Sequence, residues 1–275
     1  MHITSLHLYP VKSCRGLTVA AATLDDFGLV GDRRFLVVSA ADGKFLTQRN
    51  HPRMALIETT LNSHELILSS PNHGSVSVPL RPPASIPSIN SRIVTVWNST
   101  VTADDCGDES AEWLSRFLGL TLRLVRMGGS FHRPVKPGKA RPGDVVTFAD
   151  AYPLLLISEA SLDNLNDRLA AQHEETLPMD RFRPNLVVTG CAPHAEDEWP
   201  RIDLGGVVFR NAGPCARCPV TTIDQLTAMR GKEPLRTFAT YRRDKEDSTK
   251  VNFGINLIHE TKRGTLNVGT PVSLC

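Results

Sequence analysis

Short runs of alternating and β-branched residues, separated by turn-forming residues, dominate this chain and most constrain its fold. Such runs are typical of β-strands joined by tight turns. In the first half of the chain they cover residues 3–9, 34–38, 55–61, 65–68, 75–78, 93–97 and 100–103. The proline-rich residues 82–87 interrupt them, and we expect these to form a surface loop rather than a domain linker. The first part of the chain is therefore predicted to be a small β-rich lobe.

Helical periodicity is confined to two segments in the middle of the chain. The first begins near Asp108, which can cap it, and ends at Gly119, and its apolar residues share one face. The second begins near Ser158, and its leucines form one apolar stripe. Between them lies a long loop, residues 128–143, rich in glycine, proline and cations. Long irregular loops are often functional, and this composition suits the border of an anionic ligand.

Strand-like runs return in the second half of the chain, where they cover residues 185–189, 207–211, 220–223, 253–259 and 265–268. Many short strands and few helices favour a barrel or a sandwich. The lack of regular strand–helix alternation argues against a doubly wound sheet. The chain is therefore predicted to be α+β and mainly β, with a few packing helices. Its 275 residues are long enough for two closely packed lobes.

Composition narrows the class of protein further. Apolar residues make up 41% and charged residues 22%, which is ordinary for a folded soluble protein. The formal net charge is only +2 and the charges of both signs are interleaved, so nucleic acid is not expected as a partner. No apolar run approaches the roughly 20 residues that span a bilayer, and the first residues alternate like a strand rather than a signal peptide. We expect a cytoplasmic protein without a membrane span, with its six cysteines reduced.

The pair Cys215 and Cys218 offers three kinds of chemistry. A structural zinc site needs two further ligands, and the odd separation of His2 and His7 puts them on opposite faces of a strand. A dithiol couple relies on a helix N-terminus, whereas Pro219 disfavours helix at Cys218 and residues 220–223 are predicted to continue as a strand. The residues alone leave two alternatives open, a single thiolate metal ligand beside Arg217 and a pair of inert buried cysteines.

A second set of residues is cationic and lies in turns. It comprises Lys12 with Ser13, Arg33, and Arg183 with Asn185. Such side chains suit a ligand phosphate, although each one alone is as readily a solvated surface cation. The sequence has neither a glycine-rich dinucleotide motif nor a Gly-Lys-Ser/Thr loop. Any phosphate would therefore be held by side chains from separate loops.

Taken together, the motifs resemble a known family. In chain order they are YPVKSCRG (9–16), GDR (31–33), TQR (47–49), DAYP (150–153), SEASL (158–162), FRPN (182–185), CARC (215–218), KEPL (232–235) and FGIN (253–256). The chain is similar over nearly its full length to the MOSC domain proteins with an N-terminal MOSC β-barrel domain, in particular the molybdenum-dependent amidoxime-reducing proteins. The resemblance implies a MOSC-type β-barrel, with the N-terminal domain at residues 1–120 and the MOSC domain at residues 121–275.

The resemblance also implies a site for the molybdenum cofactor, molybdopterin with molybdenum. It assigns the metal to Cys218, which would also be the catalytic residue, rather than to Cys215. It places five residues around the pterin's phosphate and ring system, namely Lys12, Ser13, Arg33, Arg183 and Asn185. Asp150, Ala216, Arg217 and Asn256 match further cofactor-binding positions. Tyr152 is not expected to be a contact, and Cys14 is expected only to pack.

The implied activity is the two-electron reduction of small N-hydroxylated compounds such as amidoximes and hydroxylamines. The chain ends soon after its last predicted strand and has no four-cysteine cluster motif, so we expect a separate electron carrier. A ferredoxin, a flavoprotein or a cytochrome b5-like protein would serve. The alternative is a sulfur carrier or cofactor-delivery protein that uses a persulfide on Cys218, because MOSC domains also occur in molybdenum-cofactor sulfurases. A binding protein without catalysis is the third possibility.

Overall fold

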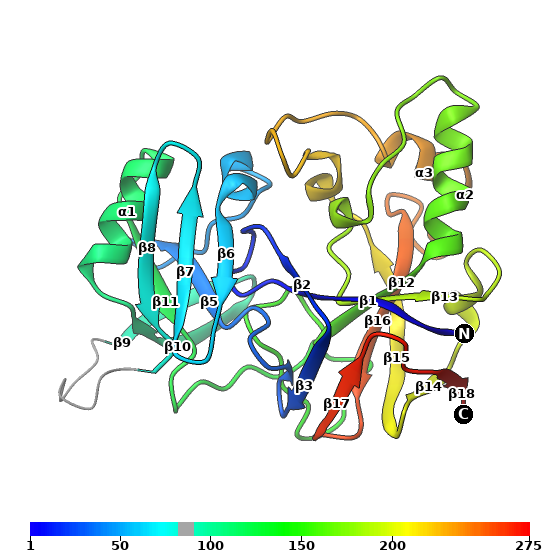
Figure 1. Ribbon diagram of the computed structural model, residues 1–275, viewed down its shortest axis with the longest axis horizontal. Helices are drawn as coiled ribbons and strands as arrows, with labels where there is room; N and C mark the ends of the chain where they lie inside the picture. Colours follow the sequence, from blue (N-terminus) through cyan, green and yellow to red (C-terminus); the bar gives the residue numbers. More distant parts are fainter. Residues whose placement is uncertain (82–90) are drawn as a thin grey trace.

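A computed structural model describes residues 1–81 and 91–275. The chain forms two lobes that lie side by side, and both termini lie on the lobe drawn at the right of Figure 1. The architecture is α+β and mainly β, as predicted from the sequence. The proline-rich residues 82–87, predicted to be a surface loop, lie outside the described residues.

The N-terminal lobe is built from two antiparallel sheets and one helix. One sheet has the order β5-β11-β10-β9, and the other is the meander β6-β7-β8. Their bounds are β5 Phe35–Ser39, β6 Glu58–Leu61, β7 Glu65–Ser70, β8 Gly74–Pro79, β9 Ser91–Val96, β10 Ser99–Asp105 and β11 Leu122–Arg126, with the 3-10 helix η1 Pro52–Leu56 before β6. Alternate residues of β7 are buried, because one face of this meander packs on the lobe's core.

Helix α1, Asp108–Leu118, closes the core of this lobe with Trp113, Leu114 and Phe117. It ends at Gly119 in a left-handed conformation, as predicted. The predicted cap is wrong, since Asp108 is the first helical residue and Gly107 holds the cap position without a side-chain hydrogen bond. Asp108 instead places its carboxylate in the first turn, where its negative charge interacts favourably with the positive end of the helix dipole.

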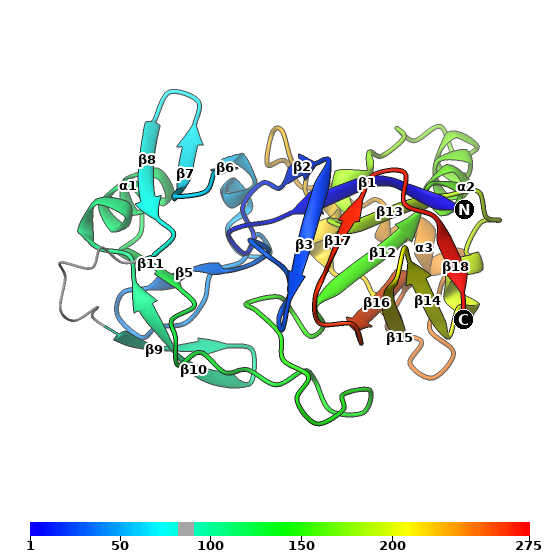
Figure 2. The same cartoon turned by 60° about the horizontal axis from the view of Figure 1, so that its bottom comes forward.

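The C-terminal lobe is organised around an eight-stranded sheet with the order β18-β14-β15-β16-β12-β13-β1-β2. Only β12 and β13 run parallel among the pairs of this sheet that are described. The bounds are β1 His2–Leu8, β2 Leu17–Val19, β12 Leu154–Ser158, β13 Leu186–Thr189, β14 Arg201–Leu204, β15 Val207–Ala216, β16 Asn252–His259 and β18 Val272–Leu274. A small sheet of β3 Ala21–Asp25, β4 Gly28–Leu29 and β17 Gly264–Asn267 completes the β-structure, and Figure 2 shows β3 beside β17.

Two helices and three short 3-10 turns cover the C-terminal lobe. They are α2 Glu159–Ala170, α3 Leu235–Tyr241, η2 Met179–Arg181, η3 Ala195–Glu198 and η4 Pro219–Thr222. Helix α2 begins as predicted after Ser158, whose hydroxyl accepts a hydrogen bond from the Ser161 amide. Within the described parts of the chain, no helix has the length and apolar content that crossing a membrane requires.

The N-terminal strand joins the two lobes. β1 pairs with β13 of the large sheet, and β3 pairs with β17, so both strands belong to the C-terminal lobe. Between them the chain touches the N-terminal lobe, where Val11 forms a bridge with Phe35 and Cys14 packs in the core. The domain boundary between residues 120 and 121 stays a prediction. In space, the N-terminal segment of the chain contributes to both lobes.

The segment after Cys218 differs from its prediction. Residues 220–223 were expected to be a strand, but Pro219–Thr222 form the single 3-10 turn η4. Proline suits the first helical position because its φ is already helical and it has no amide hydrogen to lose. The Thr221 and Thr222 hydroxyls then donate to the Cys218 and Pro219 carbonyls, which secures the turn. β-branched residues alone could not reveal this.

Candidate functional site

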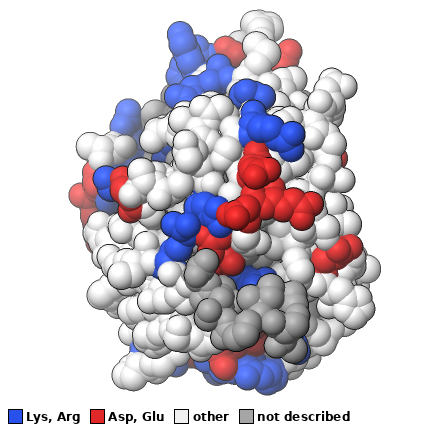
Figure 3. Space-filling model, turned by 90° about the vertical axis from the view of Figure 1, so that its left-hand side faces the viewer, with Lys and Arg blue, Asp and Glu red and all other residues white. Residues whose placement is uncertain are grey.

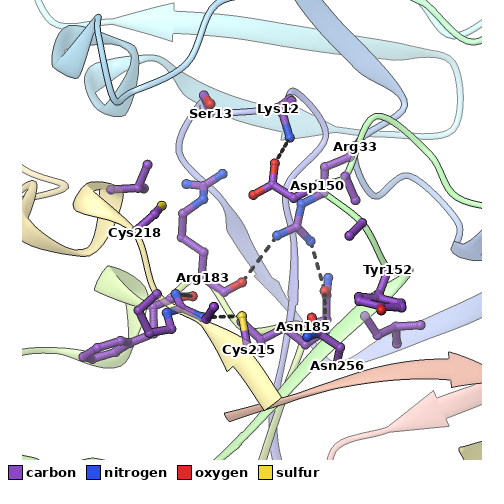
Figure 4. Close-up of a pocket in the computed structure, with 18 of the residues that line it drawn as sticks. Lys12, Ser13, Arg33, Asp150, Tyr152, Arg183, Asn185, Cys215, Cys218 and Asn256 are labelled. Carbon is purple, nitrogen blue, oxygen red and sulfur yellow. Dashed lines mark hydrogen bonds and ion pairs between the residues drawn. The ribbon is translucent and has the colours of Figure 1, made fainter. Parts of the chain in front are cut away.

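An open cavity lies where the two lobes meet, and it contains every site residue named from the sequence. The ten are Lys12, Ser13, Arg33, Asp150, Arg183, Asn185, Ala216, Arg217, Cys218 and Asn256. They come from the crossover after β1, the turn before β5, the turn before β12, the turn before β13, the end of β15, and β16. Figure 4 shows Cys218, Arg183 and Asp150 around one open space. Segments that are remote in the sequence thus form a single site.

Two arginines stack on one tyrosine at the floor of this cavity. The guanidinium carbons of Arg33 and Arg183 lie 4.2 and 4.3 Å from the centroid of the Tyr9 ring. Tyr9 is itself buried, and its hydroxyl donates to the Pro184 carbonyl at 3.0 Å. Both arginines have a positive φ, 47° and 56°, which is uncommon for a residue with a side chain. The ring therefore holds two cations that would otherwise repel each other.

The two arginines differ in how their charge is balanced. Arg33 donates to both carboxylate oxygens of the buried Asp32, at 2.8 and 2.7 Å, and to Asn185 Oδ1 at 3.0 Å. No ion pair or side-chain hydrogen bond holds the Arg183 guanidinium anywhere in residues 1–81 and 91–275. Burial lowers the pKa of Arg183, although the guanidinium stays charged at neutral pH. Of the two arginines on the Tyr9 ring, Arg183 therefore presents a charge to the cavity that no carboxylate of the described residues balances.

Asn185 has a structural task within the site. Its Oδ1 accepts from Arg33 Nη1 and from the Leu155 amide at 3.2 Å, and its Nδ2 donates to the His7 carbonyl at 3.1 Å. The side chain thereby links β1, β12 and the turn before β13. We conclude that Asn185 fixes the orientation of Arg33 and has little remaining capacity to bind a ligand.

A second charged group lies on the opposite wall. The Lys12 ammonium is ion-paired with Asp150, and the Trp97 indole nitrogen donates to the same carboxylate oxygen at 3.1 Å. Arg49 stacks on the Trp97 ring at 4.5 Å. The Asp150 carboxylate opens onto the cavity. Burial opposes its ionisation, yet Lys12, Trp97 and Arg49 outweigh burial and hold the pKa of Asp150 below its usual value. It is a carboxylate at neutral pH.

Cys218 and Cys215 have different surroundings. Cys218 is half-buried with an extended backbone, at φ −123° and ψ 173°, and its sulfur has no hydrogen bond in the described part of the chain. The sulfur of Cys215 accepts from Arg217 Nη1 at 3.1 Å, while Arg217 Nη2 donates to the Phe182 carbonyl at 2.6 Å. Burial raises the pKa of Cys215, and Arg217 only partly opposes this. Of the two thiols, Cys218 has the sulfur without a protein partner.

Several residues of the cavity wall were not among the ten site residues expected from the sequence. They include Thr47, Arg49, Trp97, Tyr152 and Cys215. The TQR motif was a signal for the first two. Trp97 lies at a positive φ of 55° in the turn between β9 and β10, and no local pattern connects it with Asp150. Tyr152 lines the cavity although it was not expected to be a contact. Cys14 is fully buried in the core of the N-terminal lobe, as expected for a packing residue.

The arrangement suits an anionic ligand that carries a thiophilic metal. Arg183, Arg49 and the Ser13 hydroxyl can hold a phosphate, because charge-assisted hydrogen bonds to anions are strong. Cys218 offers a sulfur without a protein partner, as a thiolate ligand requires. The Nε of Arg217 is buried and has no partner within the described residues. These features fit a phosphorylated pterin with a metal, and the fold and site define a two-lobed β-protein with an open cavity lined by cations and a free thiol.

Comparisons with known proteins agree with this description. Residues 1–121 match the MOSC N-terminal β-barrel domain and residues 143–273 match the MOSC domain. The mitochondrial amidoxime-reducing component 1 of Mus musculus is 36% identical over 99% of this chain and 82% of its own length. Component 2 of Macaca fascicularis is 36% identical over 98% and 82%. The molybdenum cofactor sulfurase of Danio rerio is 34% identical over 98% of this chain but 34% of its own length.

The chain therefore belongs to the family of proteins that combine a MOSC N-terminal β-barrel domain with a MOSC domain, among them the amidoxime-reducing components.

Proposed function

We propose that this protein is a molybdenum-cofactor-dependent oxidoreductase that reduces N-hydroxylated compounds such as amidoximes and hydroxylamines. One observation carries the proposal: the Arg183 guanidinium without an anion and the Cys218 sulfur without a partner line the same cavity. An anionic cofactor with a metal satisfies both at once. The names of the similar amidoxime-reducing components support the reaction class.

The residues divide into those that would touch the cofactor and those that position them. Cys218 would be the metal ligand, and Arg183 with Ser13 would hold the phosphate. Asn185 would position Arg33, and Arg33 would position the Tyr9 ring, since the polar atoms of both side chains are already engaged. The remaining wall residues would face the pterin, namely Lys12, Asp150, Ala216, Arg217 and Asn256. When bound, the cofactor supplies the two-electron chemistry, and the protein supplies binding and orientation.

In the proposed reaction an amidoxime takes up two electrons and two protons. Its N–O bond breaks, and the products are an amidine and water. Asp150 stays ionised at neutral pH, so it orients Lys12 and Trp97 rather than donating a proton. The electrons would come from a separate ferredoxin, flavoprotein or cytochrome b5-like protein. Cytoplasmic residence stays a prediction, and the amidoxime-reducing relatives are mitochondrial by name.

The test compares the wild type with Cys218→Ala and with Cys275→Ala, a matched control at an exposed cysteine. Each protein is purified from cells that make the cofactor, its molybdenum is quantified, and benzamidoxime reduction is followed with dithionite-reduced methyl viologen. We expect the control to match the wild type and Cys218→Ala to lose both metal and activity. Equal molybdenum in Cys218→Ala would refute the ligand assignment. A wild type replete with molybdenum but inactive would refute the reaction.

A second candidate is a sulfur carrier or cofactor-delivery protein that uses a persulfide on Cys218. The similarity to the Danio rerio molybdenum cofactor sulfurase favours it. Intact-mass spectrometry of freshly isolated protein should then show a cyanide-labile addition of about 32 Da, one sulfur atom. Cys218→Ala should remove this addition. A freshly isolated wild type without it argues against the sulfur carrier.

A further inference from the structure

The loop between η4 and α3 is held together by hydrogen bonds among its own residues. Asp224 Oδ1 accepts from the Leu226 amide at 3.0 Å and from the Thr227 amide at 2.8 Å. The Asp224 amide donates to the Met229 carbonyl at 2.8 Å, and the Ala228 amide donates to the Asp224 carbonyl at 2.9 Å. These bonds close the loop on itself. The backbone from which its side chains project is therefore fixed.

This ordered loop directs two large apolar side chains into solvent. Leu226 and Met229 are each 71% exposed, more than any other large apolar residue of the described chain except Ile93. Single exposed apolar residues are common, but a close pair on a rigid loop is typical of a protein interaction site. Methionine also adapts its shape to a partner, which suits a transient contact.

The loop is attached directly to the wall of the cavity. The side-chain amide of Gln225 exchanges hydrogen bonds with that of Gln48, at 3.0 and 3.2 Å. Gln48 lies between Thr47 and Arg49, which both line the cavity. Arg230 also donates to the Arg49 carbonyl. In Figure 1 the gold and orange segment that follows β15 lies at the top, between the two lobes. The apolar pair is thus carried on the outer side of the cavity wall.

Positive charge surrounds the pair. The two carboxylates of this segment are neutralised locally, since Asp224 pairs with Arg181 at 3.2 Å and Glu233 pairs with Arg236 at 2.6 Å. Arg230 and Lys232 are exposed, and neither forms an ion pair with a residue that the structure describes. By contrast, the face of the N-terminal lobe in Figure 3 shows charges of both signs side by side. The exposed cations of the loop are therefore complementary in charge to a partner protein with an acidic surface.

We infer that Leu226, Met229, Arg230 and Lys232 form the docking surface for a small acidic electron-transfer protein. The inference rests on the proposed function, which requires an external electron source. Electron transfer weakens steeply with distance, so the carrier must dock beside the cavity, where this loop lies. Apolar contacts at the centre and complementary charge around them are the usual anatomy of such an interface.

The test compares three proteins loaded with cofactor. Leu226→Ser/Met229→Ser removes the apolar pair, and Ile93→Ser/Leu120→Ser removes two exposed apolar residues of the other lobe as a matched control. Benzamidoxime reduction is measured with dithionite-reduced methyl viologen and with reduced [2Fe–2S] ferredoxin, flavodoxin and cytochrome b5. With the best carrier, we expect kcat/KM for that carrier to fall about tenfold in the loop variant, as for loss of central interface contacts. The viologen rate and the control should not change.

Lys232→Glu should also lower this kcat/KM and weaken its dependence on salt.

The outcomes separate the two proposals. No activity with viologen in a molybdenum-replete wild type defeats the proposed function and this inference with it. Viologen activity without turnover by any of the three carriers overturns the acidic partner alone. An unchanged carrier kcat/KM in the loop variant, or an equal loss in the control, overturns the docking surface.

Discussion

Arg33 and Arg183 stack on the same Tyr9 ring at nearly equal distances, yet only Arg33 has a carboxylate partner. In protein prepared without cofactor, we expect Arg183→Met to raise the free energy of unfolding and Arg33→Met to lower it. Methionine preserves the long unbranched side chain in both cases. Both positions have a left-handed backbone, so the change in backbone strain is matched.

The expected magnitudes follow from the two environments. The Arg183 guanidinium has no hydrogen-bond partner within the described residues but opens onto the cavity, so its removal relieves at most about 1–3 kcal/mol. Loss of the cation–π contact with Tyr9 costs roughly 0.5–2 kcal/mol. The net gain for Arg183→Met is therefore at most about 1 kcal/mol. Arg33→Met leaves the buried Asp32 carboxylate without its cation, and breaking a buried pair in this way costs about 3–5 kcal/mol.

The assay is urea unfolding of protein made in cells that cannot synthesise molybdopterin, followed by circular dichroism. With cofactor bound, the order of Arg183→Met and the wild type should reverse, because a ligand that binds the native state stabilises it and this variant binds the phosphate poorly. An apo Arg183→Met protein at least 1 kcal/mol less stable than the wild type would refute the reasoning. The guanidinium would then have a favourable partner in the apo state.

Three further predictions test other parts of the molecule. Burial lowers the pKa of His259 to about 4, below its unfolded value of 6.5. The folded state therefore binds fewer protons than the unfolded state, and the free energy of unfolding should fall on the order of 3 kcal/mol as pH drops from 7 to 4. His259→Gln should flatten the pH dependence of thermal unfolding, and parallel curves of melting temperature against pH for the variant and the wild type would contradict this. Gly254→Ala should cost about 3 kcal/mol in urea unfolding, because its φ is 75° and a Cβ would lie 2.6 Å from a side-chain carbon of β12. Gly269→Ala, with φ 88° and open space around it, should cost about 1 kcal/mol, and equal losses would disprove the steric argument. Burial raises the pKa of Cys14 to about 12, so Cys14 should react with a thiol reagent at pH 8 only after unfolding, whereas the exposed Cys275 reacts at once.

Much of the β-structure could be predicted from the sequence. β1, β5, β7, β8 and β16 lie where alternating or β-branched residues were found. In β7 and β8 one buried face imposes a period of two, whereas β5 and β16 are mostly buried and were marked by their apolar and β-branched residues. Helix α1 ends at Gly119, where only glycine adopts a left-handed conformation without strain. Strands such as β12 and β14 and the short helix α3 were not predicted. β12 is buried on all its residues, so it shows no alternation, and β14 has only four residues.

For the candidate site, the residues could be predicted but their contacts could not. The resemblance named ten residues, and all ten line one cavity. It could not reveal that Asn185 is occupied by Arg33, or that Trp97 reaches Asp150 from the other lobe. Such contacts depend on distances between segments far apart in the chain.

The sequence by itself determined the kinds of residue available at the site, because local pattern and side-chain chemistry are properties of the chain. It also determined that Cys218 is extended, since the residue before a proline avoids the helical region. The tertiary structure decided which charges are balanced. Arg33 and Arg183 lie in similar turns and on the same ring, yet Asp32 neutralises only one of them. Charge balance is set by packing in three dimensions, and this difference leaves Arg183 in the cavity without a carboxylate partner.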